Sequence, residues 1–385
     1  MSNTMSFCDL AVPGVQALQP YQPGKPMSEL ARELGLRPEQ IVKLASNENP
    51  LGPSPKALAA AREALAESHR YPDGNAFELR AALAEHHGVE PGQITLGSGS
   101  NDVLELVARA FLRTGLKCVF SQHAFAVYPI ATQAVGAEAV VVPALGADSD
   151  SPAGHDLEAM ADAVDADTRV VFIANPNNPT GTWVGAEAVE RFLARMPAHV
   201  IVVLDEAYVE YAARAPGYRE GSYLLARHPN LIITRTFSKA YGLGGLRVGY
   251  GLSDPQVADL LNRVRMPFNV NNVAQAAATA ALDDREHLRR SVELNGREMQ
   301  RLGQALAGMG LSSLPSAANF LCTRVGPRAE EVNQGLLRQG VIVRPVGGGY
   351  QLPEYLRFSI GTEAENDRLL QALAVLRDEG LLGAD

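Results

Sequence analysis

The segment TRTFSKAYGLGGLRVGY at 234–250 combines a lysine with groups that can hold an anion. Lys239 follows the apolar run LIITRTFS and sits among small residues. A lysine in that setting is expected to have a lowered pKa and to be able to form an imine with an aldehyde. A surface lysine whose stem lies along apolar neighbours is the ordinary alternative. The hydroxyls of Thr236 and Ser238 and the guanidinium of Arg247 favour a phosphate site instead, because arginine binds phosphate in a bidentate manner.

Three further polar clusters follow apolar runs, in GSGSND at 97–102, ANPNNPTG at 174–181 and LDEAYVEY at 204–211. Each cluster alone could be an ordinary turn, since Asn-Pro and Gly-Ser are common turn residues. Together with Lys239 they favour a single site, because ligands of open parallel sheets bind beyond the carboxyl ends of the strands. The backbone N–H groups of Ser100 and Asn101 begin the helical pattern NDVLELVARAFL and could hold a phosphate there.

The elements that must position these clusters alternate along the chain. VVFIANP, VIVVLDE and LIITRTFS are continuous apolar strands separated by helical patterns, which predicts a mostly parallel sheet of the seven-stranded type, covered by helices on both faces. After about residue 275, a long charged helix at 284–306 precedes short strands in NFLCTRV, GVIVRPV and LRFSIGT. We therefore expect an α/β protein with a large domain at 46–275 and a smaller α/β domain at 276–385. Residues 1–45 would form an irregular arm and part of the small domain.

Composition limits the function classes. Hydrophobic residues make up 46% and charged residues 20% of the 385 residues, as in globular proteins. A net charge of -9 argues against nucleic-acid binding, which needs clustered cations. The three cysteines have no zinc or disulfide spacing, so we expect no metal. There is no apolar run of about 20 residues and no signal-peptide pattern at the start, so we expect a cytoplasmic protein without a membrane segment.

The four clusters, in this order, resemble the fold-type I pyridoxal-phosphate enzymes over nearly the whole chain. The resemblance implies pyridoxal 5′-phosphate as cofactor, with Lys239 as the lysine that holds it as a Schiff base. It also implies that Asp205 pairs with the ring nitrogen and keeps it protonated, so that the ring can accept electrons. Asn178 and Tyr208 would hydrogen-bond the phenolic oxygen.

The same resemblance implies partners for the rest of the cofactor. Ser100, Asn101, Thr236, Ser238 and Arg247 would surround its phosphate. Phe125 resembles the aromatic residue that stacks on the ring, although its spacing equally suits a core phenylalanine. Tyr71, in RYPDG, resembles the tyrosine that reaches the phosphate of a neighbouring subunit, which implies a homodimer with shared sites.

Within fold type I, the chain most resembles the histidinol-phosphate aminotransferase family, in KLASNENPLGPSP at 43–55, RYPDG at 70–74 and GVIVRP with LRFSIGTEAEN at 340–366. That resemblance implies transamination of histidinol phosphate with 2-oxoglutarate, giving imidazole acetol phosphate and glutamate in histidine biosynthesis. It also implies Tyr21, Asn47, Arg344 and Arg357 as residues on the substrate side. The loop at 346–355 is more glycine-rich than is usual in the family. This departure affects how tightly the far end of the substrate would be bound.

Other function classes fit the sequence less well. GLGGLRVG is similar to a dinucleotide fingerprint, but Arg247 stands in place of the third glycine and no acidic residue ends the next strand. The pair His86-His87 is interpreted as a solvated helix end, and His123 and His155 have no partners at metal-ligand spacing, which disfavours a metal hydrolase. A binding module without catalysis would not need the lysine and Asp205. Aromatic-amino-acid aminotransferases and a phosphothreonine-type decarboxylase share the pattern and stay as alternatives.

Overall fold

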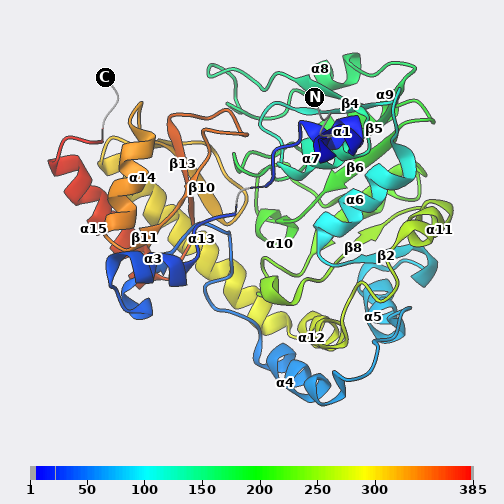
Figure 1. Ribbon diagram of the computed structural model, residues 1–385, viewed down its shortest axis with the longest axis horizontal. Helices are drawn as coiled ribbons and strands as arrows, with labels where there is room; N and C mark the ends of the chain where they lie inside the picture. The colour runs from blue at the N-terminus through cyan, green and yellow to red at the C-terminus, as the bar shows by residue number, and fades with distance from the viewer. Residues whose placement is uncertain (1–5, 22, 383–385) are drawn as a thin grey trace, which may run out of the picture.

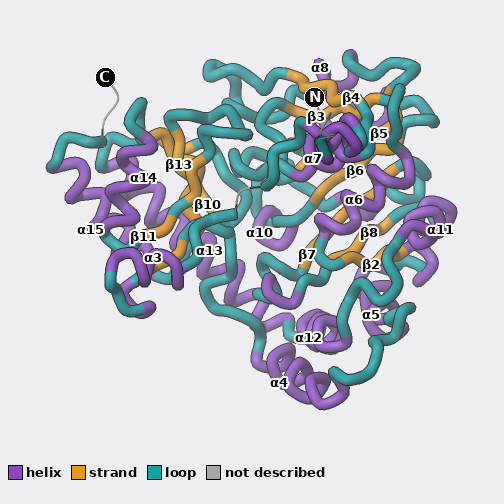
Figure 2. Tube along the Cα trace, viewed as in Figure 1, coloured by secondary structure: helices purple, strands orange, loops and turns teal. Residues whose placement is uncertain are grey.

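The computed structural model describes residues 6–21 and 23–382, and its strands fall into two main groups with helices outside them (Figures 1 and 2). The large sheet has seven strands in the order β2-β8-β7-β6-β5-β3-β4. Its strands are β2 Ile94–Gly97, β3 Lys117–Ser121, β4 Glu138–Val142, β5 Thr168–Ala174, β6 Ile201–Asp205, β7 Leu231–Thr236 and β8 Gly249–Leu252. Strand β8 is antiparallel to both neighbours and the other pairs are parallel. The prediction of a mostly parallel, helix-covered α/β sheet is confirmed.

Side chains alternate along the strands of the large sheet, so successive residues face helices on opposite sides of it. In β6, Ile201 and Val203 face the core formed with α6 Ser100–Phe111, α7 Val127–Ala134 and α11 Pro255–Val264. Val202 and Leu204 face the opposite core, which includes helices α5 Phe77–His87, α8 Leu157–Asp162, α9 Ala186–Arg195 and α12 Asn272–Leu282, with α4 Pro55–Ala64 packed on α12. Because successive side chains alternate, the residue after Leu204 returns to the α6, α7 and α11 side. That residue is Asp205.

The small sheet has the order β12-β13-β10-β9, and a separate pair joins β1 to β11. Its strands are β9 Ser312–Ser313, β10 Phe320–Arg324, β12 Arg344–Pro345 and β13 Tyr355–Ser359, with β1 Val42–Lys43 and β11 Val341–Ile342 beside it. Helices α13 Arg285–Gly308, α14 Ala329–Arg338 and α15 Glu363–Asp378 pack around them. This core is distinct from those of the large sheet, although the predicted domain boundaries stay a prediction.

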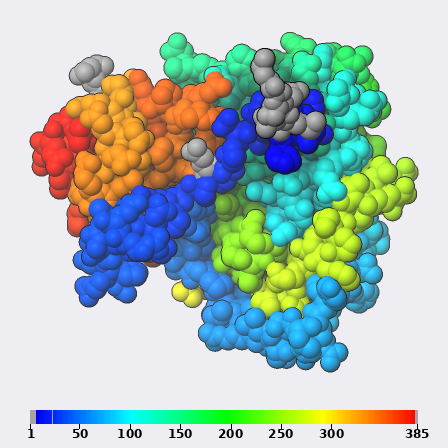
Figure 3. Space-filling view, viewed as in Figure 1, coloured from blue at the N-terminus to red at the C-terminus, as the bar shows by residue number. Residues whose placement is uncertain are grey.

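The N-terminal segment lies across both parts of the molecule, as the blue residues of Figure 3 show. It contains the short helices α1 Phe7–Leu10 and α2 Pro13–Gln16, with α2 against α7, and then α3 Met27–Leu34 beside the small sheet. We expected an irregular arm before α3. Helices of four residues are too short to show a hydrophobic period in the sequence, which is why α1 and α2 were not predicted. Helix α10 Val209–Ala212 is equally short.

Within the described part of the chain, no helix combines the length and the apolar character needed to cross a lipid bilayer.

Candidate active site

A cavity of about 390 Å³ lies where the large sheet, the small sheet and the N-terminal segment meet. Fourteen of the fifteen residues predicted for the site line it: Tyr21, Asn47, Ser100, Asn101, Phe125, Asn178, Asp205, Tyr208, Thr236, Ser238, Lys239, Arg247, Arg344 and Arg357. Strands β6 and β7, which are adjacent in the sheet, supply Asp205 and Thr236 from their carboxyl ends. The structure therefore brings these residues together, while their roles stay predictions.

Asp205 is a carboxylate that the fold buries and surrounds with donors. Tyr128 donates its hydroxyl to Oδ2 at 2.9 Å, and Thr234 donates to Oδ1 at 2.9 Å. The backbone N–H of Ala207 also donates to Asp205. Burial raises the pKa of Asp205 above its ordinary value, although these hydrogen bonds act in the opposite direction. A cation placed in the cavity beside Asp205 would lower that pKa again and stabilise the ionised carboxylate.

Lys239 lines the same cavity, and its surroundings favour loss of the proton of its amine. Its Nζ donates to the backbone carbonyl of Ser46 at 3.2 Å and lies 5.7 Å from the ring centre of Tyr208. Burial lowers the pKa of Lys239 to about 8, and the positive charge of Arg357 acts in the same direction. An amine with that pKa has a substantial neutral fraction near neutral pH, as a nucleophile requires.

An anion-binding cradle lies at the start of α6. Gly99 has a φ of 87°, and a Cβ placed on it would lie 2.5 Å from Nη2 of Arg247. A Cβ on Gly249 would lie 2.4 Å from the backbone nitrogen of Ser100. No side chain of the described chain caps this 12-residue helix, so its first N–H groups and its dipole face the cavity. The hydroxyl of Ser238 accepts from Nη1 of Arg247 at 3.2 Å, which adds a guanidinium to the cradle.

Two of the residues predicted for the substrate side, Asn47 and Arg357, are hydrogen-bonded to neighbouring side chains. Asn47 donates through Nδ2 to the hydroxyl of Tyr208 at 2.9 Å, and Ser359 holds Asn47 through two hydrogen bonds of 2.8 and 2.9 Å. Arg357 donates through Nη1 to Oδ1 of Asn178 and through Nη2 to the carbonyl of Ala45. Its Nε is buried and has no hydrogen-bond partner among the described residues.

Arg344 and the glycine-rich loop form the outer wall of the cavity. The guanidinium carbon of Arg344 lies 5.5 Å from the ring centre of Tyr21. The loop that follows is fastened at Tyr350, which is buried and whose carbonyl lies 2.7 Å from Nδ1 of the buried His123. The run of glycines at 347–349 therefore lies between fixed ends.

Tyr71 is the predicted residue that the structure does not bring to the cavity. Its side chain is 84% exposed and stacks on Phe268 with ring centres 4.9 Å apart. Phe77 and Met266 are large apolar side chains that are also exposed, and they lie close to Tyr71 and Phe268 in the sequence. Within one chain, Tyr71 thus cannot contact the anion cradle.

Sequence reasoning missed Tyr128 and Thr234. Tyr128 is fully buried and stacks on Phe172 with ring centres 4.6 Å apart at 9°. It is the second residue of α7 and follows Phe125, which lies just before the helix and whose ring centre is 5.9 Å away. Thr234 precedes Thr236 by two residues, and the period of two along β7 was a usable signal.

Comparison with known proteins agrees with this geometry. The model of the family described as aminotransferase class I and II matches residues 39–373. The histidinol-phosphate aminotransferase 2 of Pseudomonas fluorescens strain Pf0-1 is 63% identical over 368 residues, covering 96% of this chain and 97% of its own. That of Pseudomonas aeruginosa is 62% identical, covering 95% and 97%. The solved structure of histidinol-phosphate aminotransferase from Sinorhizobium meliloti in complex with pyridoxal-5′-phosphate has a TM-score of 0.85 at 33% identity, covering 95% and 97%.

Removing the hydroxyl of Tyr128 should destabilise the ionised form of Asp205. Tyr128→Phe should lower the free energy of unfolding by about 1.5–3 kcal/mol, the usual contribution of a hydrogen bond to a charged group. The hydrogen bond favours the carboxylate, so the loss should be largest at pH 8 and should shrink as the pH falls through the folded-state pKa of Asp205. Urea unfolding of both proteins between pH 5 and 8 measures this difference.

Tyr223→Phe is the matched control, because the Tyr223 hydroxyl donates to the carboxylate of Glu190 at 2.7 Å in a half-exposed position. Its cost should be about 1 kcal/mol or less. Equal and pH-independent losses in the two variants would contradict the assignment of Tyr128 as the partner that stabilises the Asp205 carboxylate.

Proposed function

Since this chain belongs to the aminotransferase class I and II family, we propose that it transfers the amino group of L-histidinol phosphate to 2-oxoglutarate. The products would be imidazole acetol phosphate and glutamate, and the cofactor pyridoxal 5′-phosphate. Relatives named for this activity are 62–63% identical over nearly the whole chain. The observation that carries the proposal is a cavity that joins a lysine, a buried carboxylate and an anion cradle to two arginines on the small sheet. The expected cytoplasmic location is part of the same proposal.

The residues present fit the cofactor. At the cradle, Gly99 and Gly249 let Arg247 and the first N–H group of α6 approach closely, because a Cβ on either glycine would clash with them, and this leaves donors that a phosphate needs. Asp205 is buried without a formal ion-pair partner in the described chain, as expected of a carboxylate that pairs with a protonated ring nitrogen. When bound, the cofactor supplies an electron-withdrawing ring that stabilises the carbanion formed at the substrate. Ser100, Asn101, Thr236, Ser238 and Arg247 would hold its phosphate.

The remaining cofactor contacts are proposed from the same geometry. Because Oδ1 of Asn178 accepts from Arg357, its Nδ2 group is left to donate to the phenolic oxygen. The hydroxyl of Tyr208 accepts from Asn47 and keeps its own proton to donate to that oxygen. Burial raises the pKa of Tyr208, so this hydroxyl stays neutral at physiological pH. Phe125 is half-buried at the cavity and would stack on the ring.

Lys239 has two tasks in this proposal. Its neutral amine is the nucleophile that attaches the cofactor, and the lowered pKa near 8 makes that form accessible. With the substrate bound, Nζ of Lys239 would take the proton from the substrate's α-carbon and so act as the base of the reaction. The carbonyl of Ser46, 3.2 Å from Nζ, orients the amine. Burial, together with the positive charge of Arg357, keeps the pKa of Lys239 low.

The two arginines account for substrate choice. Histidinol phosphate has no carboxylate, so its phosphate dianion is the group that a binding site can grip with charge. Arg357 lines the cavity, and Arg344 adds a second guanidinium beside Tyr21. Two guanidinium groups suit a dianion better than a monoanion, because each bidentate pair adds charge and geometry. Asn47, fixed by Ser359, would face the same substrate.

We propose further that the protein is a homodimer with shared sites. The support is the exposed ring of Tyr71, stacked on the partly exposed Phe268 and outside the cavity of its own chain. A second copy could place this hydroxyl at the phosphate cradle. The exposed Phe77 and Met266 would be covered in the same contact, which removes apolar surface from water.

Lys239→Ala should abolish the visible absorbance of the bound cofactor and nearly all turnover, because both the covalent attachment and the proton carrier are lost. Borohydride reduction of the wild type should add the mass of the reduced cofactor to the peptide that contains Lys239. Lys56→Ala is the control, since Lys56 is an exposed lysine that donates to the carbonyl of Asp283. Near-normal activity of Lys239→Ala, or labelling of another lysine, would refute the assignment.

Arg344→Ala should lower kcat/KM for histidinol phosphate about 10- to 100-fold and have a much smaller effect with phenylalanine, in line with the loss of a charge-assisted contact. Arg357→Ala should impair both substrates. The measurement is the ratio of the two specificity constants in the wild type and both variants. An unchanged ratio for Arg344→Ala, or a wild type that prefers phenylalanine, favours an aromatic aminotransferase. Release of CO2 from O-phosphothreonine would favour the decarboxylase alternative.

Tyr71→Phe should weaken cofactor retention by about 1.5–3 kcal/mol, the contribution of one hydrogen bond to a charged group. Equilibrium dialysis against pyridoxal phosphate measures it, and sedimentation velocity establishes whether the dimer persists. Tyr223→Phe, whose hydroxyl bonds to Glu190, should retain the cofactor normally. An active monomer, or unchanged affinity in Tyr71→Phe, would count against the shared site.

A further inference from the structure

Helix α13 carries a row of buried polar side chains that the proposed chemistry does not use. His287, Ser291, Asn295 and Glu298 are each at most 9% exposed, and their spacings of four, four and three residues place them on one face. Buried polar groups are costly unless they are hydrogen-bonded, and each of these bonds to a segment outside the helix. The row therefore connects α13 to several loops.

The N-terminal half of this row is tied to the segment that carries Lys239. Nδ2 of Asn49 donates to the hydroxyl of Ser291 and to the carbonyl of Ala240, both at 2.8 Å. Ala240 is the residue after Lys239. Nε2 of His287 lies 3.1 Å from the carbonyl of Gly52, in the same loop as Asn49. This end of α13 thus has a fixed position relative to the amine.

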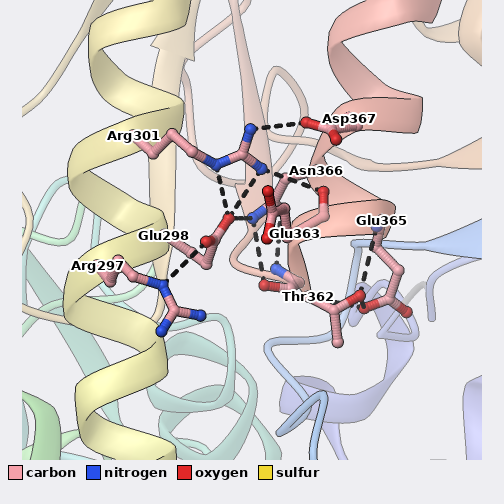
Figure 4. Close-up of polar contacts among 9 residues, drawn as sticks. Arg297, Glu298, Arg301, Thr362, Glu363, Glu365, Asn366 and Asp367 are labelled. Atoms are coloured by element: carbon pink, nitrogen blue, oxygen red, sulfur yellow. Dashed lines mark hydrogen bonds and ion pairs between the residues drawn. The ribbon is translucent and has the colours of Figure 1, made fainter.

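The C-terminal half is tied to the turn that follows β13 (Figure 4). Glu298 accepts through Oε2 from Nδ2 of Asn366 at 3.0 Å and from Nε of Arg301 at 2.9 Å. Asn366 in turn bonds both backbone groups of Gly361, accepting from its N–H at 3.0 Å and donating to its carbonyl at 3.2 Å. Arg301 closes the group by donating to Asp367 at 2.6 Å and to the carbonyl of Glu363 at 3.1 Å.

Strand β13 transmits this position to the cavity. Arg357 and Ser359 are two residues apart, so they lie on the same face of the strand, and Gly361 follows two residues later. Ser359 fixes Asn47, and Arg357 bonds Asn178. A Cβ on Gly361 would lie 2.8 Å from carbon atoms of both Leu44 and Glu365, so the turn is tightly packed. A shift of the turn at Gly361 would therefore move the substrate-side residues of β13.

We propose that Glu298 and Asn366 are positioning residues, which set Arg357 and Asn47 relative to Lys239 through the turn at Gly361 and the polar row of α13. The inference rests on the proposed function as far as the substrate is concerned. Burial raises the pKa of Glu298, but the hydrogen bonds from Asn366, Arg301 and Arg297 outweigh it and leave the pKa lowered. Glu298 is therefore an anion at neutral pH and holds both Asn366 and Arg301.

Glu298→Gln is the direct test, because it keeps the shape and removes the charge. We expect KM for histidinol phosphate to rise about tenfold with kcat changed less than about threefold, since Arg357 shifts while Lys239 and its cofactor stay in place. The visible absorbance should show that the cofactor stays bound. Hydrogen–deuterium exchange of residues 355–361 should become faster. Glu293→Gln is the matched control, since Glu293 pairs with Arg289 at 2.7 Å on the exposed side of α13.

A second variant separates positioning from stability. In Glu298→Gln with Asn366→Asp, the carboxylate moves to the partner residue, where it can accept from the new amide and from the N–H of Gly361. We expect this double variant to recover most of the KM and of the exchange protection, as a double-mutant cycle would show. If Glu298→Gln does not fold, Arg301→Ala removes the outer contacts of the half-exposed Arg301 and should give the same changes in smaller degree.

The outcomes are distinguishable from a failure of the proposed function. If histidinol phosphate is not a substrate, the proposed function fails, whereas the exchange of 355–361 still tests the positioning. Faster exchange with an unchanged KM for the true amino donor would overturn the proposal. A lowered melting temperature with unchanged exchange and KM would overturn it as well, and would make Glu298 a stabilising residue alone.

Discussion

The burial of one carboxylate constrains most of this structure. Asp205 ends a strand of the sheet interior at 4% exposure, and an isolated charge in such a place costs several kcal/mol. The fold offsets part of this cost with hydrogen bonds from Tyr128, Thr234 and the backbone of Ala207. A cation in the cavity would offset the rest, and without one the raised pKa favours the protonated carboxyl. These donors lie on one face of the sheet because side chains alternate along β6 and β7. Helix α7 is positioned on that face, and Tyr128 packs there on Phe172.

A second constraint is the distance between site residues that are held by two separate hydrophobic cores. Lys239 and Asp205 are held by the large sheet, whereas Arg344 and Arg357 belong to the small one. An apolar cluster that includes Tyr208, Ala240 and Phe320 joins the two parts beside the cavity. Apolar contact alone is non-directional and does not fix a register. The directional bonds of the polar row on α13 supply that register, so the spacing between the amine and the arginines is set by a helix that contributes no residue to the lining of the cavity.

The sequence predicted the parts of the fold whose signals are local. The apolar strands and the polar clusters at their ends placed Asp205, Asn178 and Lys239 at one edge of a parallel sheet, because that edge is the same for every strand. Strand β8 was not recognised, since Gly249 and Gly251 give its short run no apolar alternation. Tyr128 was missed because its bond to Asp205 joins residues 77 apart in the chain. The polar face of α13 was taken for part of an ordinary charged helix, since buried Ser291 and Asn295 have the same side chains as solvated ones. Tyr71 lies outside the cavity of its own chain, so its predicted contact depends on the proposed second copy.

Under the proposed function, the division between the two sheets also separates the residues of the chemistry from those of substrate specificity. The groups around Asp205 and Lys239 depend on strands in the middle of the large sheet, where a substitution disturbs two packed layers. Arg344 lies on the two-residue strand β12, at the edge of the small sheet and next to a glycine-rich loop. That loop has a fixed end, because the carbonyl of Tyr350 is hydrogen-bonded to His123, which lies shortly before the start of α7. Changes confined to β12 and this loop can therefore alter the outer wall of the cavity. The contact of Tyr350 with His123 meanwhile holds the loop in place near Phe125. Substrate range is the property that this architecture leaves most open to change, and the electrostatics of Asp205 the property that it protects.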